Sequence, residues 1–232
     1  MKTRLPSDRR KSAFSLIELL VVIAIIGIIS AFAVPAVGNL LKGSAMTQAA
    51  NILSDQCASA RQQALTRNRS VEVRFYKFAN PEDPGATTDP NARQYRAVQT
   101  FEIGDGGIVN PTGKFAKFPD TVIMNATPAL SSIFNLPEQI PNANDPDLPG
   151  GLRKTDTRYV AFRFQPDGST SLTQSGPIGV PNANGRWYLT AHLATDLGRS
   201  TGTTPPVNFF TWMIDPVTGS TKILRPGLAV GK

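Results

Sequence analysis

The feature that most constrains this chain is an apolar run near its N-terminus. From Leu19 to Leu41 the sequence contains no charged residue over 23 positions. A helix needs about 20 apolar residues to cross roughly 30 Å of hydrocarbon. Residues 1–13 carry five basic side chains and one acidic side chain, and basic residues before a span favour a cytoplasmic N-terminus. We therefore predict a single membrane-spanning segment over about residues 17–41.

Simpler interpretations of this run leave one residue unexplained. A secretory signal peptide has a shorter apolar core and a small-residue cleavage site after it, so the run is too long for one. A plain signal anchor fits the hydropathy but does not explain Glu18. A carboxylate costs about 2.5–3.5 kcal/mol near mid-membrane, and less near an interface. The local sequence offers Glu18 no evident partner within a helical turn.

The order of residues around Glu18 resembles the prepilin signal of type IV pilins and type II secretion pseudopilins. A basic leader is followed by Ala13-Phe14-Ser15-Leu16-Ile17-Glu18 and then by a β-branched apolar run. The resemblance implies that a prepilin peptidase removes residues 1–13 by cleaving between Ala13 and Phe14. It also implies methylation of the new amino group of Phe14. The family most often has Gly where this chain has Ala13.

Glu18 is the fifth residue of the mature chain, where the family carries its Glu. In a bundle of such helices, Glu18 of one chain can meet the Phe14 ammonium of a neighbour. Buried polar pairs are best attested as devices that fix register. We therefore predict that Glu18 acts in filament assembly. In the alternative, Glu18 only reaches toward the headgroups.

The helix is expected to continue well beyond the apolar run. Pro35 removes one backbone hydrogen bond and should kink the helix, and pilin helices commonly carry a kinking proline there. In the alternative, Pro35 ends the helix and a loop follows. Beyond Gly43, apolar residues recur at steps of three and four. We predict a helical region over residues 14–68 whose second half packs on a globular domain.

The remainder of the chain favours strands joined by turns. Of the 19 prolines and 19 glycines, 17 and 16 lie from Pro81 onward, which prohibits long helices. The expected strands are 71–76, 95–103, 158–164, 187–193, 207–214 and 220–224. Turns are expected at 165–168 and 215–219, and loop insertions at 80–93 and 134–157. The predicted fold class is α+β and pilin-like: a long N-terminal helix packed on an antiparallel β-sheet domain of residues 69–232.

Three segments resemble a narrower group, the H-type (GspH/FimT-like) pseudopilins. They are residues 60–73 at the expected junction of helix and first strand, the F-x-P-D-G turn at 164–168, and the closing hairpin at 214–219. The chain is also similar to a prepilin-like cassette family of verrucomicrobial genomes. The resemblance implies a minor subunit of a secretion pseudopilus.

The sequence lacks the motifs of common enzymes. One Cys and one His exclude an intrachain disulfide, multi-Cys metal sites and His clusters. No P-loop, G-x-S-x-G or H-E-x-x-H motif occurs. His192 is expected to be structural. Cys57 is expected to be a buried small side chain, with cross-linking of subunits as the alternative. We expect no enzymatic activity and no cofactor.

Two weaker ligand patterns remain. Asn144, Asp145 and Asp147 offer oxygen ligands for calcium, although a solvated loop is the favoured interpretation because no EF-hand pattern is present. Arg61, Arg67 and Arg69 could touch DNA phosphates. The net charge is +7, but residues 1–13 supply +4 of it, so a solvated helix end is favoured.

The predicted function is that of a structural subunit. It enters the bacterial inner membrane as a single-pass protein with a periplasmic C-terminal domain, is processed by prepilin peptidase, and assembles with sibling pilins or pseudopilins through its N-terminal helix. One alternative is a DNA-binding minor pilin for DNA uptake. Another is a surface or enzymatic domain that uses a prepilin-type anchor, which a polar cavity with convergent ionisable groups would favour.

Overall fold

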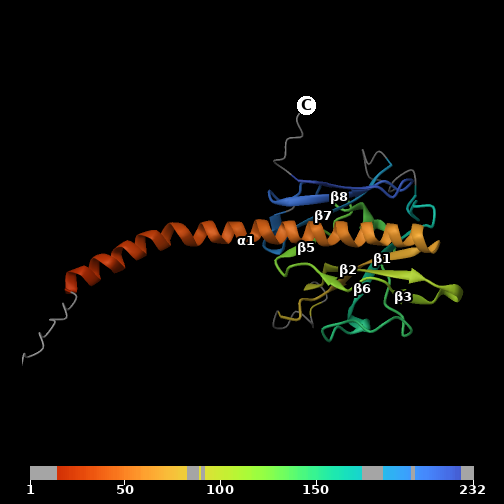
Figure 1. The fold of residues 1–232 in the computed structure, drawn as a ribbon, viewed down its shortest axis with the longest axis horizontal. Helices are drawn as coiled ribbons and strands as arrows, with labels where there is room; N and C mark the ends of the chain where they lie inside the picture. Colours follow the sequence, from red (N-terminus) through yellow and green to blue (C-terminus); the bar gives the residue numbers. More distant parts are fainter. Residues whose placement is uncertain (1–14, 83–88, 90–91, 174–184, 200–201, 226–232) are drawn as a thin grey trace, which may run out of the picture. The chain divides into compact units, whose positions relative to one another are not determined.

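A computed structural model describes residues 15–82, 89, 92–173, 185–199 and 202–225 (Figure 1). The chain divides into two compact units, Met1–Leu41 and Lys42–Lys232. One helix, α1 (Leu16–Arg67), contributes to both units, and the second unit also contains the sheet.

Helix α1 begins and ends within two residues of the predicted helical region, residues 14–68. It spans 52 residues, and Asn68 follows it with a φ of 53°, the left-handed geometry that Asn tolerates. The helix continues through Pro35, so the alternative in which a loop follows Pro35 is wrong. Proline removes only one donor, and the neighbouring turns remain helical. The kink at Pro35 stays a prediction.

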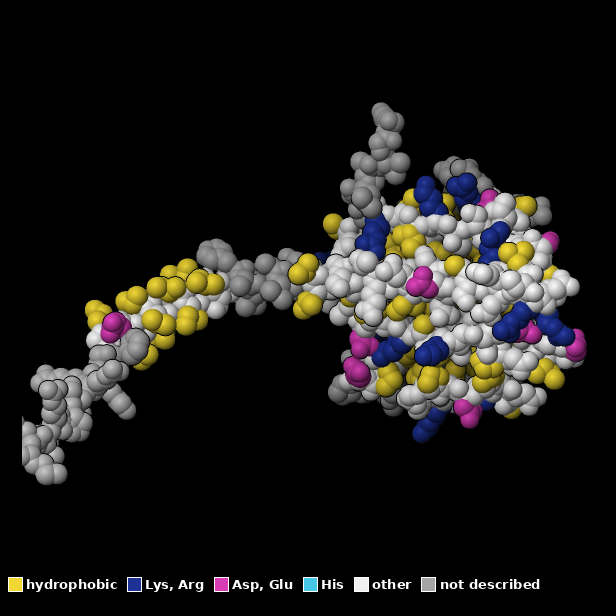
Figure 2. Space-filling model, in the orientation of Figure 1, with side chains coloured by type: hydrophobic (Ala, Val, Ile, Leu, Met, Phe, Trp, Pro, Cys, Tyr) yellow, Lys and Arg dark blue, Asp and Glu magenta, His cyan; other side chains and the backbone are white. Residues whose placement is uncertain are grey.

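In the first unit, α1 presents apolar side chains to solvent (Figure 2). The exposed large apolar residues described in this unit are Leu16, Ile17, Leu19, Leu20, Val21, Val22, Ile23, Ile25, Ile26, Ile28, Ile29, Leu40 and Leu41. Within the described ranges, no helix combines the length and hydropathy of a membrane span. The span over residues 17–41 therefore stays a prediction.

The second unit contains one antiparallel sheet. Its described strands are β1 (Val71–Phe78), β2 (Gln94–Ile103), β3 (Val109–Pro111), β4 (Ala116–Lys117), β5 (Val122–Met124), β6 (Arg158–Phe164), β7 (Trp187–Leu193), β8 (Phe209–Ile214) and β9 (Thr221–Leu224). The strand order is β6-β1-β2-β5-β7-β8-β9, and β3 and β4 also pair with β2. The predicted α+β class is confirmed.

One face of the sheet packs against the second half of α1. The helix buries Met46, Ala49, Ala50, Leu53, Cys57, Ala60 and Ala64, at the spacing expected of one helical stripe. On the sheet side, Val71, Val73 and Phe75 of β1 join the same cluster, together with Trp212 of β8. This packing explains why the amphipathic pattern begins after Gly43.

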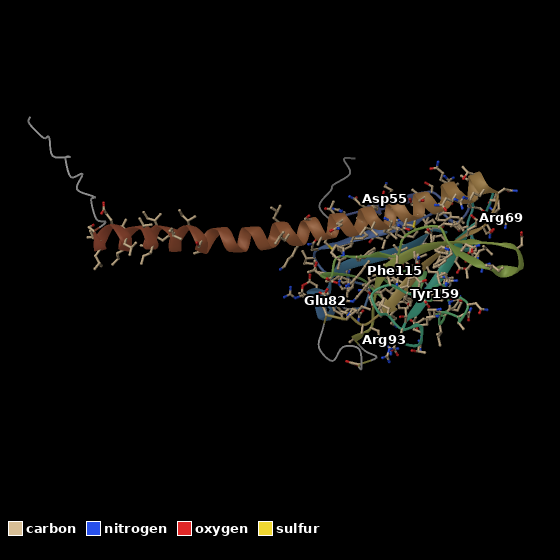
Figure 3. All side chains as sticks on the ribbon, turned by 60° about the horizontal axis from the view of Figure 1, so that its bottom comes forward. Asp55, Arg69, Glu82, Arg93, Phe115 and Tyr159 are labelled. Carbon is tan, nitrogen blue, oxygen red and sulfur yellow. The ribbon has the colours of Figure 1, made fainter. Side chains whose placement is uncertain are left out.

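The opposite face of the sheet is also buried. Tyr76, Phe78, Ala97, Phe101 and Tyr159 form a second apolar cluster, to which Phe115, Leu148 and Leu152 add partly buried contacts; Figure 3 labels Phe115 and Tyr159. The expected insertion at 134–157 supplies part of this cover. The 3₁₀ helix η3 (Ser132–Asn135) overlaps its start, and the 3₁₀ helix η4 (Lys154–Asp156) lies near its end. Two further 3₁₀ helices, η2 (Asp105–Gly107) and η5 (Ala194–Arg199), lie in connections.

The longer strands match the prediction closely. β6 and β7 have the expected bounds, and β1, β2, β8 and β9 differ from expectation by one or two residues at an end. The sequence did not predict β3, β4 and β5, which contain two or three residues each. Such segments are too short to show an alternating pattern.

Candidate functional site

The start of α1 holds Glu18 in a reciprocal pair of hydrogen bonds. The Ser15 backbone N–H donates to Glu18 Oε2 at 2.9 Å, and the Glu18 N–H donates to Ser15 Oγ at 3.2 Å. This is a capping box, whose sequence pattern is Ser-x-x-Glu. The expectation that Glu18 has no local partner is therefore wrong, and the spacing of Ser15 and Glu18 was the signal that could have corrected it.

The capping box leaves part of the Glu18 carboxylate available. Among the described residues, its hydrogen bonds use Oε2 and not Oε1. The first turn of α1 follows directly on the predicted cleavage bond, because the helix begins at Leu16. Ala13 and Phe14 lie outside the described residues. The processing and methylation sites therefore stay predictions.

Near its C-terminal end, α1 is joined to two turns of the sheet domain through Arg61. Its Nε donates to the carbonyl oxygens of Thr218 at 3.1 Å and Gly168 at 3.4 Å. Thr170 also links the turns, because its N–H and hydroxyl both donate to the Pro216 carbonyl, at 2.9 and 3.0 Å. The three segments that resemble H-type pseudopilins therefore meet in one place.

The arginines considered for DNA binding have partners within the chain. Arg67 Nη1 lies 2.6 Å from Glu102 Oε2. Arg69, just after α1 in Figure 3, pairs with Asp105 at 3.1 Å and lies 3.9 Å from Glu102. With Arg61 bound to carbonyls, this end of the domain presents little unbalanced positive charge to a phosphate backbone.

The residues considered for calcium do not form one ligand set. Asp145 is buried and its Oδ2 lies 3.0 Å from Arg74 Nη1, whereas the exposed Asp147 pairs with Lys154 at 3.2 Å. Asn144 is exposed. Among the described residues, no group of three or more His, Cys, Asp or Glu side chains could hold a metal ion.

A buried ionic cluster lies on the sheet face away from α1. Glu72 accepts hydrogen bonds from Arg74 Nε at 2.7 Å and from Arg163 Nε at 2.8 Å. The Arg74 guanidinium lies between the rings of Phe101 and Tyr159, 4.5 and 4.4 Å from their centroids. Burial works against the charge of Arg74, but Glu72 outweighs it and raises the Arg74 pKa.

Sequence reasoning missed this ionic cluster. The alternation in 71–76 correctly places Glu72 and Arg74 on the same face. It gives no indication that Asp145, 71 positions after Arg74, would be their neighbour. Long-range pairs of this kind have no local signal.

His192 and Cys57 are both core residues. His192 is fully buried; its Nδ1 lies 2.8 Å from the Leu193 carbonyl and its Nε2 lies 3.0 Å from Asn125 Nδ2. A carbonyl only accepts, so the network assigns the proton to Nδ1. Burial raises the pKa of the free Cys57 thiol, which disfavours the reactive thiolate.

The comparisons with known proteins concern the N-terminal segment. Residues 8–34 match the family described as the prokaryotic N-terminal methylation motif. No curated protein and no solved structure matches the chain. The motif supports a type IV pilin-like or pseudopilin-like protein, and it implies processing by prepilin peptidase and assembly with other pilins.

Proposed function

We propose that the chain is a structural subunit, a minor pseudopilin of a type II secretion pseudopilus or of a related type IV pilus-like filament. The observation that carries this proposal is the methylation motif at residues 8–34. The motif includes the first part of α1, whose apolar side chains are exposed in the first unit. A large exposed apolar surface needs lipid or another protein to cover it.

Before assembly, the first half of α1 occupies the bacterial inner membrane as a single span, with the sheet domain in the periplasm. The uncharged run from Leu19 to Leu41 and the basic leader support this orientation. Assembly then transfers the helix from lipid to the helix-lined core of a filament. Neither environment requires the subunit to perform catalysis, and we propose that it is not an enzyme.

The proposed assembly contact joins Glu18 of one subunit to the Phe14 ammonium of another. The Ser15 backbone N–H binds one oxygen of the carboxylate. The other oxygen can accept a hydrogen bond from the Phe14 ammonium of the neighbouring chain. A buried carboxylate with both a local donor and a cationic partner avoids most of the cost of desolvation. The pair also sets the axial register of the helices.

The H-type assignment is supported by the meeting of the three signature segments at Arg61. That contact fixes the second half of α1 to the sheet, so that force on the helix is transmitted to the domain. DNA uptake is the alternative function, but the pairing of Arg67 and Arg69 with acids counts against it. The use of the motif as a plain anchor for a surface domain is the other alternative, and a hollow lined by Glu72, Arg74 and Arg163 counts in its favour.

Variants at positions 15 and 18 separate the charge of Glu18 from its role in capping. Glu18→Gln retains the Ser-x-x-Gln capping box and loses the charge, whereas Ser15→Ala weakens the cap and retains the charge. We expect Glu18→Gln to reach the membrane but to be depleted at least about tenfold from sheared filaments, equivalent to about 1.4 kcal/mol. The Ser15→Ala variant should still assemble into filaments. Normal assembly of Glu18→Gln contradicts the pairing.

The processing step is tested by mass spectrometry of the mature protein from a strain with working prepilin peptidase. The expected N-terminus is N-methylated Phe14. A chain that retains residues 1–13 in that strain rules out the proposed function.

A further inference from the structure

Two adjoining hollows open beside the buried ionic cluster. The outer one measures ≈ 440 Å³, which is within the range of about 300–1,000 Å³ for ligand pockets. It lies between the turn at Gly106–Val109 and the loop at Asn142–Asp145. The inner one measures ≈ 210 Å³ and reaches Glu72, Arg74 and Arg163. We call the two hollows together the hairpin cleft.

The charges at the base of the hairpin cleft balance. Glu72 binds Arg74 and Arg163 through its two oxygens, and Asp145 lies 3.0 Å from Arg74. Two guanidinium groups therefore face two carboxylates. A ligand with a net charge would leave one buried charge without a counterpart, which is costly.

One donor at this base forms an ion pair but no hydrogen bond. Arg74 Nη1 is buried and makes no hydrogen bond among the described residues, because Asp145 Oδ2, although close, is out of line with the N–H groups. The Arg74 side chain is only 4% exposed, and the rings of Phe101 and Tyr159 cover both faces of its guanidinium. Because Arg74 lines the inner hollow, a ligand oxygen there can accept a hydrogen bond from this donor.

The rim of the cleft adds neutral polar groups and an apolar wall. Asn142 and Asn144 are exposed there and offer amide donors and acceptors. Ile108 is 63% exposed beside them. A hydroxyl group can accept from Arg74 and donate to a carboxylate at the same time, so a polyhydroxylated ring with an apolar face matches this combination.

We propose that the hairpin cleft binds an uncharged sugar ring. A sugar hydroxyl accepts an in-line hydrogen bond from Arg74 Nη1, which has none, and donates to Asp145 or Glu72. The ring carbons lie against Ile108, and the two asparagines bind the remaining hydroxyls. This activity is independent of filament assembly and would give the sheet domain a contact with glycan.

The test uses the full chain in an amine-oxide detergent, because glycoside detergents carry the group under test. N-acetylglucosamine is the neutral probe, and glucosamine and glucuronate are its cationic and anionic counterparts. Calorimetric titration should give saturable binding of N-acetylglucosamine with a Kd below about 10 mM, and at least about tenfold weaker binding of both charged sugars. No saturable binding of the neutral probe overturns the proposal, as does equal or tighter binding of either charged sugar.

A pair of alanine variants locates the site. Ala143→Trp fills the outer hollow from an exposed position of its wall, whereas Ala126→Trp places the same side chain at an exposed position outside the cleft lining. We expect Ala143→Trp to weaken binding of N-acetylglucosamine at least about tenfold and Ala126→Trp to leave it unchanged, with the same melting temperature in both. Binding that survives Ala143→Trp contradicts this location.

Discussion

At the scale of single residues, His192 shows how burial determines chemistry. Both ring nitrogens are satisfied by Asn125 and the Leu193 carbonyl, and no exposed ring atom remains to bind a substrate. Burial lowers the His192 pKa, although the Leu193 carbonyl and Asp196 oppose that change. The folded protein therefore holds a neutral imidazole at a pH where the unfolded chain begins to protonate it.

This difference predicts that acid destabilises the protein through His192. The unfolded imidazole titrates near pH 6.5 and the folded one at a lower pH, so the unfolded state binds more protons and the free energy of unfolding falls as the pH drops below about 6.5. The slope approaches about 1.4 kcal/mol per pH unit. Urea unfolding at pH 7.5, 6.5 and 5.5 measures it. The His192→Gln variant should lack this contribution. If both proteins lose the same free energy of unfolding between pH 7.5 and 5.5, the effect does not come from His192.

At the scale of elements, the contact between α1 and its two turns depends on Gly219. This glycine has a φ of 63°, and a Cβ there would collide with the Gly168 carbonyl oxygen and lie 3.0 Å from Arg61 Nε. Gly219→Ala should lower the free energy of unfolding by about 1–2 kcal/mol for the left-handed backbone and a further 1–3 kcal/mol or so for the collision. Urea unfolding midpoints measure the total.

Gly106 provides the matched control for Gly219. It has a φ of 74°, but no described atom lies within 4 Å of a Cβ built there. Gly106→Ala should therefore show only the backbone cost. Equal destabilisation by the two substitutions would mean that the turns and α1 are not closely packed.

The elements that the sequence could predict are those with a long local pattern. The steps of three and four after Gly43 predicted the buried stripe of α1, and the alternation in 71–76 predicted the two faces of β1. The cover on the second face could not be predicted, because Leu148 and Leu152 lie in a Pro-rich segment without periodicity. The capping box could have been predicted from Ser15 and Glu18, whereas the contact between Arg74 and Asp145 has no local signal.

At the scale of the whole molecule, the predicted domain boundary and the compact units divide α1 differently. The sequence suggested a globular domain of residues 69–232, which separates the helix from the sheet. The compact unit begins at Lys42, because the buried stripe from Met46 to Ala64 belongs to the same apolar cluster as β1 and β8. The second half of α1 is therefore part of the domain core.

Two truncations test this division of the molecule. A chain of residues 42–232 keeps the helix stripe and should unfold cooperatively in water, because its main apolar cluster is complete. A chain of residues 69–232 exposes the sheet face that carries Val73, Phe75 and Trp212. Exposing each such aromatic or aliphatic side chain to water costs about 1.5–3 kcal/mol of folding free energy. Since domains are stable by only about 5–15 kcal/mol, the shorter chain should not fold. Near-UV circular dichroism and thermal melting distinguish the two, and a cooperative transition in the 69–232 chain would support the boundary expected from the sequence.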